Sequence, residues 1–154
     1  MKKEAFCQYC IDSYRPVENM VKMVPADKLT WKPGENFMTV GELFSHLCEG
    51  IGSELKMLLT NNWPAHPEGP MPSCTAVEGL AKLEKDKVVL RELIAGISED
   101  DFANREATTP WGASGTIEIM GLFFKEHFTN HKMQLFTYLK LLGLPVNTQT
   151  LYGG

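Results

Sequence analysis

Four long segments of this sequence carry apolar residues at helical spacing, and turn-rich connections separate them. Within residues 3–24, 39–60, 76–96 and 116–142, apolar side chains recur three or four positions apart, which places them on one face of a helix. No alternating pattern of useful length predicts a β-strand. We therefore expect an all-α fold, a four-helix bundle in which residues 1–154 form a single domain.

Two of these segments begin with a capping box, in which a threonine and a glutamate three residues later each bond the other's backbone amide. Thr39 with Glu42 predicts the start of the second helix, and Thr75 with Glu78 predicts the start of the third. Gly143 follows the fourth segment, as expected for a residue that ends a helix. The apolar face of the second segment runs to its end, so we expect one helix there.

Prolines and glycines indicate where the chain leaves these helices. Pro16 should kink or interrupt the first helix, because proline lacks the amide that bonds the preceding turn. Residues 64–74 contain four prolines and predict a surface loop. Residues 98–103 are expected to form a short extra turn of helix, and residues 105–115 an irregular segment that includes a small hairpin.

Charge and the length of the apolar stretches argue against two classes of partner, nucleic acid and membrane. Fifteen Lys and Arg residues stand against nineteen Asp and Glu residues, a formal net charge of -4, and the basic residues are scattered. A protein that binds nucleic acid normally presents a basic surface to the phosphates, so we expect no nucleic-acid partner. No stretch approaches the roughly 18 consecutive apolar residues of a membrane span. Polar residues interrupt the beginning of the chain, so we expect no secretion signal.

The four cysteines are too sparse for a disulfide scaffold in a chain of this size. We therefore expect a cytoplasmic protein with reduced thiols. Cys7 and Cys10 have the spacing of a redox or zinc motif, but the strand-to-helix context of a redox motif and the second pair of a zinc site are missing. Two cysteines on a helix, one of them partly buried, is the better interpretation.

Three of the four histidines occupy helix positions that are expected to be buried. His127 and His131 lie four residues apart on the inward face of the fourth helix, in line with Leu135. His46 lies in the apolar stripe of the second helix, next to Leu47. Imidazoles in a core need polar partners, and a bundle can bring these three rings to one point.

Three neutral imidazoles suit a divalent cation such as Zn²⁺ or Ni²⁺, and three protein ligands leave a position for water or substrate. The alternative is a set of hydrogen-bonded core histidines, which spacing alone does not exclude.

Glu49 is a candidate partner of the site, with a solvated role as its alternative. His66 is expected in a solvated loop. Trp31, Trp63 and Trp111 are expected to pack at the ends of the bundle, with Trp111 also a candidate for the rim of a pocket.

Several stretches resemble the DinB family, the DNA-damage-inducible-like metalloproteins of the DinB/YfiT-like superfamily. They are residues 29–34 (LTWKPG), residues 39–47 (TVGELFSHL) and residues 127–135 (HFTNHKMQL). The likeness continues through residues 138–143 to Pro145. In order and spacing these stretches cover almost the whole chain.

The resemblance implies an up-down bundle with a long crossover connection, frequent homodimers, and a divalent metal held by His46, His127 and His131. It also implies an enzyme that acts with a low-molecular-weight thiol on a small electrophile, as a thiol S-transferase or isomerase does. Two alternatives stay open: a non-catalytic metal-binding stress-response protein, and a hydrolase that uses metal-bound water. Lys132 and Met133 stand where many relatives have Arg and Gly, which puts in doubt any substrate contact made by the Arg.

Overall fold

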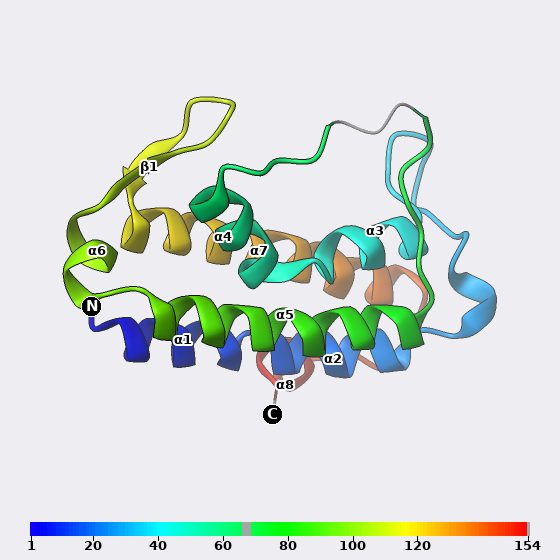
Figure 1. Ribbon diagram of the computed structural model, residues 1–154. Helices are drawn as coiled ribbons and strands as arrows, with labels where there is room; N and C mark the ends of the chain where they lie inside the picture. Colours follow the sequence, from blue (N-terminus) through cyan, green and yellow to red (C-terminus); the bar gives the residue numbers. More distant parts are fainter. Residues whose placement is uncertain (66–68, 154) are drawn as a thin grey trace.

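The computed structural model describes residues 1–65 and 69–153 and has the predicted helical-bundle architecture (Figure 1). The helices that build the bundle are α1 (Lys3–Asp12), α2 (Tyr14–Met23), α3 (Val40–Leu47), α4 (Gly50–Thr60), α5 (Ala76–Gly96) and α7 (Ile117–Leu141). The minor elements are a 3₁₀ turn (Ala26–Lys28), α6 (Glu99–Asn104), β1 (Glu106–Thr108), β2 (Ser114–Thr116) and α8 (Thr148–Tyr152).

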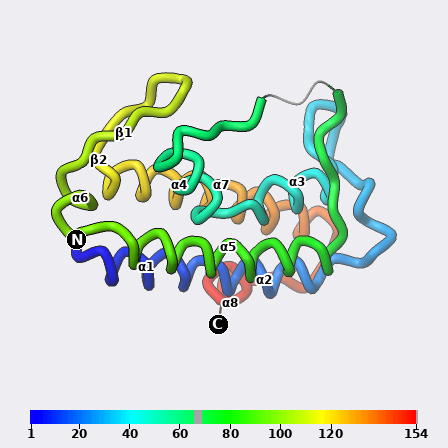
Figure 2. Tube along the Cα trace, viewed as in Figure 1, coloured from blue at the N-terminus to red at the C-terminus, as the bar shows by residue number. Residues whose placement is uncertain are grey.

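The path of the chain includes the long crossover that the resemblance implied. The α1–α2 pair runs one way along the bundle, and α3 and α4 return (Figures 1 and 2). The chain then goes back along the bundle, so that α5 runs in the same direction as α3 and α4, and α7 reverses again. In this arrangement α4 packs on α5, and both α3 and α4 pack on α7.

The predicted helix signals are confirmed at most ends. Both capping boxes form, and the small hairpin expected near residues 105–115 is the antiparallel pair β1–β2. Pro16 lies in the first turn of α2, and the first helix is interrupted at Ser13. Proline is tolerated there because its missing amide falls in the first turn of the new helix. None of the helices in the described ranges is long and apolar enough to cross a membrane.

The second predicted helix is wrong as a single rod. It divides into α3 and α4 at Cys48 and Glu49, and Gly50 follows with a φ of 65°. Glycine adopts this left-handed conformation readily because it has no Cβ atom, which makes the conformation costly for most other residues. A Cβ atom at residue 50 would also lie 2.3 Å from a carboxylate oxygen of Asp86, so the position requires glycine on two grounds.

A buried carboxylate receives the first amides of α4. Asp86 of α5 is 2 % exposed and accepts hydrogen bonds from the amides of Gly52, at 2.8 Å, and Ser53, at 2.6 Å. The hydroxyl of Tyr14 donates to the same carboxylate and accepts from the amide of Ile51 at 3.0 Å. Burial raises the pKa of Asp86, and the hydrogen bonds from Ser53 and Tyr14 oppose that rise. These contacts satisfy amides that the start of a helix would otherwise leave unpaired.

We expect Asp86→Ala to lower the free energy of unfolding by about 2–4 kcal/mol, measured by urea denaturation. The substitution leaves the amides of Gly52 and Ser53 and the hydroxyl of Tyr14 without their acceptor in the interior. Glu92→Ala, at an exposed position of the same helix, is the matched control and should change that free energy by no more than about 0.5 kcal/mol. Equal urea midpoints for the two variants would contradict this role of Asp86.

Candidate metal centre

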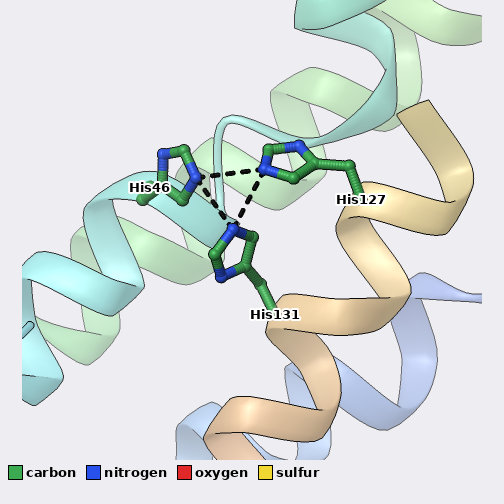
Figure 3. Close-up of side chains that lie close together, drawn as sticks. All are labelled: His46, His127 and His131. Atoms are coloured by element: carbon green, nitrogen blue, oxygen red, sulfur yellow. Dashed lines mark hydrogen bonds between the residues drawn. The ribbon is translucent and has the colours of Figure 1, made fainter. Parts of the chain in front are cut away.

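The three predicted histidines meet between α3 and α7. His46 comes from the last turn of α3, and His127 and His131 lie one turn apart on α7 (Figure 3). The Nε2 atom of His46 is 3.3 Å from that of His127 and 3.1 Å from that of His131, and the remaining pair is 3.0 Å apart. All three rings are half-buried. The predicted convergence of the rings is therefore confirmed, and they form a group that could hold a metal ion.

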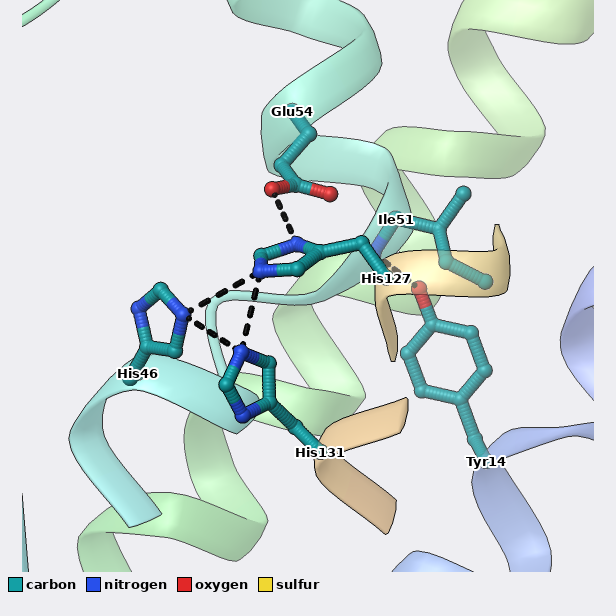
Figure 4. Close-up of polar contacts among 6 residues, drawn as sticks. All are labelled: Tyr14, His46, Ile51, Glu54, His127 and His131. Carbon is teal, nitrogen blue, oxygen red and sulfur yellow. Dashed lines mark hydrogen bonds and ion pairs between the residues drawn. The ribbon is translucent and has the colours of Figure 1, made fainter. Parts of the chain in front are cut away.

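A carboxylate from α4 orients His127. Its Nδ1 atom lies 2.8 Å from Oε1 of Glu54, on the side of the ring that faces away from the other histidines (Figure 4). A carboxylate only accepts, so Nδ1 carries the hydrogen. The Nε2 atom of the neutral ring consequently presents its lone pair to the centre of the group.

A chain of hydrogen bonds orients His131 in the same way. The hydroxyl of Tyr138 donates to the carbonyl of Met38 at 3.0 Å, so it accepts from the amide nitrogen of Gln134, which lies 3.2 Å away. The amide oxygen of Gln134 therefore faces Nδ1 of His131, at 2.9 Å. Because this oxygen accepts, Nδ1 of His131 carries the hydrogen and Nε2 presents its lone pair.

The lone-pair geometry fits a cation better than a set of hydrogen bonds. With neutral rings, Nε2 of His127 and Nε2 of His131 are both acceptors, yet they lie 3.0 Å apart. One hydrogen on His46 cannot supply all sides of the triangle. A tetrahedral zinc ion with bonds of 2.0–2.1 Å would hold its nitrogens about 3.3–3.4 Å apart, close to the observed 3.0–3.3 Å.

The pKa shifts mark which rings are free of competing protons. Burial, and then the neighbouring imidazoles, lowers the pKa of His46 to about 4, so that ring is neutral at pH 7. Burial likewise lowers the pKa of His131. The hydrogen bond to Glu54 raises the pKa of His127, while burial raises that of Glu54. A metal ligand must be deprotonated, so protons compete with a metal for the ring nitrogen. His127, whose pKa is raised, is the ring at which this competition would begin first as the pH falls.

A cavity of about 480 Å³ opens onto the three imidazoles, which are part of its lining. Glu49 and Glu54 line it too, together with apolar side chains that include Trp63 and Trp111. The candidate rim position of Trp111 is thus confirmed. Trp63, in contrast, lines the cavity rather than only packing at an end of the bundle. A site of this kind leaves room for a ligand beside the imidazole nitrogens.

The remaining sequence candidates lie elsewhere or act differently. Glu49 lines the cavity, but its carboxylate lies 3.6 Å from Nζ of Lys82 and makes no hydrogen bond to the described histidines. Trp31 packs edge to face on the ring of Tyr138. His66 lies outside the described residues. All four cysteines are free, and Cys10 is buried in α1, as expected for cysteines borne on a helix.

The departure from the DinB pattern after the second histidine of α7 also has a structural outcome. Lys132 donates from Nζ to the carbonyl of Leu151 in α8, at 3.2 Å, and does not line the cavity. Met133 is 48 % exposed and does not line it either. These two side chains therefore supply no contact to a ligand in the cavity as it stands.

Sequence reasoning missed Glu54 and Gln134. Gln134 lies three residues after His131, a spacing at which helical side chains meet, so it could have been suspected. The pairing of Glu54 with His127 depends on where α4 begins, and the sequence pattern did not reveal that break. The orienting residues of the site were therefore less visible than its histidines.

Fold and site together define a helical bundle with a three-histidine candidate metal centre between α3 and α7. No family model and no curated protein matches the sequence. The chain is similar to the crystal structure of YjoA, a DinB-like protein from Bacillus subtilis, with a TM-score of 0.65 and 19 % identity over 91 % of this chain and 96 % of that one. It is also similar to a crystal structure described as a DinB-family member from Exiguobacterium sibiricum, with a TM-score of 0.69 and 16 % identity over 96 % of each chain.

The chain therefore has the DinB-like fold, which confirms the resemblance drawn from its motifs. At these identities the likeness establishes the fold, and the chemistry of the site depends on its own residues.

We expect Glu54→Gln to weaken the binding of Zn²⁺ by about 10–100-fold, because partners of ligating histidines commonly contribute that much to metal affinity. The variant keeps the shape of the side chain but removes the carboxylate that faces Nδ1 of His127. Competition with a chromogenic chelator measures the affinity. Glu126→Gln, at an exposed position next to His127, is the control and should bind zinc like the unmodified chain. If both variants bound zinc equally well, Glu54 would have no role in holding the ligand.

Proposed function

We propose that this protein binds one divalent cation, Zn²⁺ or Ni²⁺, through His46, His127 and His131, because imidazole nitrogens suit these metals. We further propose that it is an enzyme acting with a low-molecular-weight thiol on a small electrophile. The observation that carries the proposal is that the same three Nε2 atoms lie within 3.3 Å of one another and line an open cavity.

The positions and pKa values of the cysteines favour a reacting thiol that belongs to a small molecule and not to the protein. None of the described residues that line the cavity is a cysteine. Burial raises the pKa of Cys10, to about 12, and also that of Cys48, so these thiols are poor nucleophiles at neutral pH. Among the described residues, no cysteine can therefore act as a nucleophile in this cavity, whereas a small thiol could enter it.

Each side chain of the site has a distinct part in this proposal. The three histidines would hold the cation, and Glu54 and Gln134 fix the orientation of two of the rings. A bound divalent cation would supply positive charge that lowers the pKa of a thiol or of water. The apolar wall that includes Trp63 keeps part of the cavity free of solvating polar groups, which strengthens electrostatic interactions there.

The open cavity also favours catalysis over storage of the cation. A non-catalytic metal-binding protein has no need of a space of about 480 Å³ beside the ligand atoms. A hydrolase that activates water would use the same imidazoles, so the two reactions are separated by their substrates.

Protein purified without a histidine tag and then incubated with excess zinc or nickel should contain close to one ion per chain. We expect His131→Ala to lose most of this metal, because it removes one of three ligands. Mass spectrometry of the metals gives the ratio. Asn130→Ala, which changes the exposed neighbouring residue, should retain the ion. A chain that binds no metal under these conditions would refute the proposal at its first step.

The loaded protein should accelerate the conjugation of a small thiol with an activated aryl halide, followed by absorbance of the product. Removal of the metal with a chelator should abolish the acceleration, and added metal should restore it. Hydrolysis of an activated ester without thiol conjugation would favour the hydrolase instead. Metal binding with neither reaction, over several thiols and electrophiles, would favour the non-catalytic alternative.

A further inference from the structure

One wall of the cavity is aromatic and comes from two connecting segments. One segment joins two helices and the other joins the two strands. Trp63 lies in the segment that follows α4, and Trp111 lies in the turn between β1 and β2. Their rings are edge to face, with centroids 5.0 Å apart. Phe128 of α7 and Met57 of α4 add to the apolar lining. Segments far apart in the chain thus combine into one apolar surface beside the histidines.

Trp111 leaves a large apolar surface of this wall exposed to solvent. The residue is 61 % exposed, although its ring lines the cavity and contacts Trp63. A large apolar side chain beside a pocket favours a ligand that removes it from water. An apolar group in the cavity would cover part of the exposed indole, which a small polar thiol would not do.

The charged lining opposes a ligand that bears several carboxylates. Among the described residues that line the cavity, the charged side chains are Glu49 and Glu54, and no Lys or Arg is included. One oxygen of Glu54 already faces Nδ1 of His127. Lys132, the basic residue next to His131, is turned to the carbonyl of Leu151. Glu49 is already paired with Lys82, whose Nζ lies 3.6 Å away and which does not line the cavity. A carboxylate placed away from the cation would therefore meet like charge with no basic side chain in the described lining, and this disfavours acidic thiols.

We propose that the thiol bound at this site carries its sulfhydryl on an apolar group, aromatic or aliphatic, that has no carboxylate. The inference deepens the proposed function and rests on it, because the cation is taken as the partner of the sulfur. The volume of about 480 Å³ lies in the range of pockets that enclose small organic ligands. The aromatic wall selects the apolar group, and the acidic side chains reject anionic thiols such as carboxylate-bearing peptides.

The test compares three thiols on the cobalt-loaded protein, whose visible absorption changes when sulfur enters the coordination shell. We expect 2-phenylethanethiol to bind at least about tenfold more tightly than 2-mercaptoethanol, because its ring buries apolar surface, and more tightly than glutathione. Trp111→Ala should weaken 2-phenylethanethiol by about tenfold and leave 2-mercaptoethanol within about twofold. Tyr9→Ala removes an aromatic residue that is 49 % exposed on α1 and does not line the cavity, so it should change neither affinity.

The outcomes separate this inference from the function on which it rests. Equal affinities for 2-phenylethanethiol and 2-mercaptoethanol, or tighter binding of glutathione, would overturn the ligand class and leave a metal-bound thiol in place. Bound cobalt that responds to none of the thiols would overturn the thiol function itself, and the ligand class with it. Circular dichroism checks the fold of each variant, and Met57→Ala replaces Trp111→Ala in the comparison if the latter fails to fold.

Discussion

The candidate site depends on the buried carboxylate of Asp86, which accepts hydrogen bonds from backbone amides at the start of α4. Asp86 accepts from the amides of Gly52 and Ser53, and Tyr14 places its hydroxyl between that carboxylate and the amide of Ile51. A negative charge at a helix N-terminus is favoured by the helix dipole, and here it also satisfies amides that have no partner within the helix. The contact fixes where α4 begins and ties it to α5 and α2.

This beginning of α4 decides how the site is assembled. His46 stands just before the break and Glu54 just after it, so one chain segment supplies both a candidate ligand and the carboxylate that orients a second one. Gly50 allows the chain to turn between them, because its φ of 65° is one that other residues rarely adopt. A continuous helix would fix the relative directions of the two side chains by its own period and would not leave them free to converge on α7.

The sequence predicted those parts of the molecule that depend on short-range pattern. The capping boxes at Thr39 and Thr75 form, and the inward positions of His127 and His131 follow from their line with Leu135. The break before α4 was not predictable in this way, because it depends on Asp86, which is far away in the chain and reads as one more charged residue of an amphipathic helix. The role of Glu54 was hidden for the same reason.

Partial burial of the three imidazoles between α3 and α7 costs free energy, because polar groups leave water. Hydrogen bonds from the protein's own described groups offset this cost only in part. Glu54 and Gln134 satisfy the outer nitrogens of His127 and His131, which leaves the inner lone pairs directed at one another. Core positions filled by apolar side chains would avoid this arrangement at no cost in hydrogen bonds. A divalent cation would resolve it, because the same lone pairs that repel would become ligands and the nearby carboxylate would then face a positive site. The outer hydrogen bonds of His127 and His131 thus make physical sense as a means of aiming two of the three nitrogens at a cation.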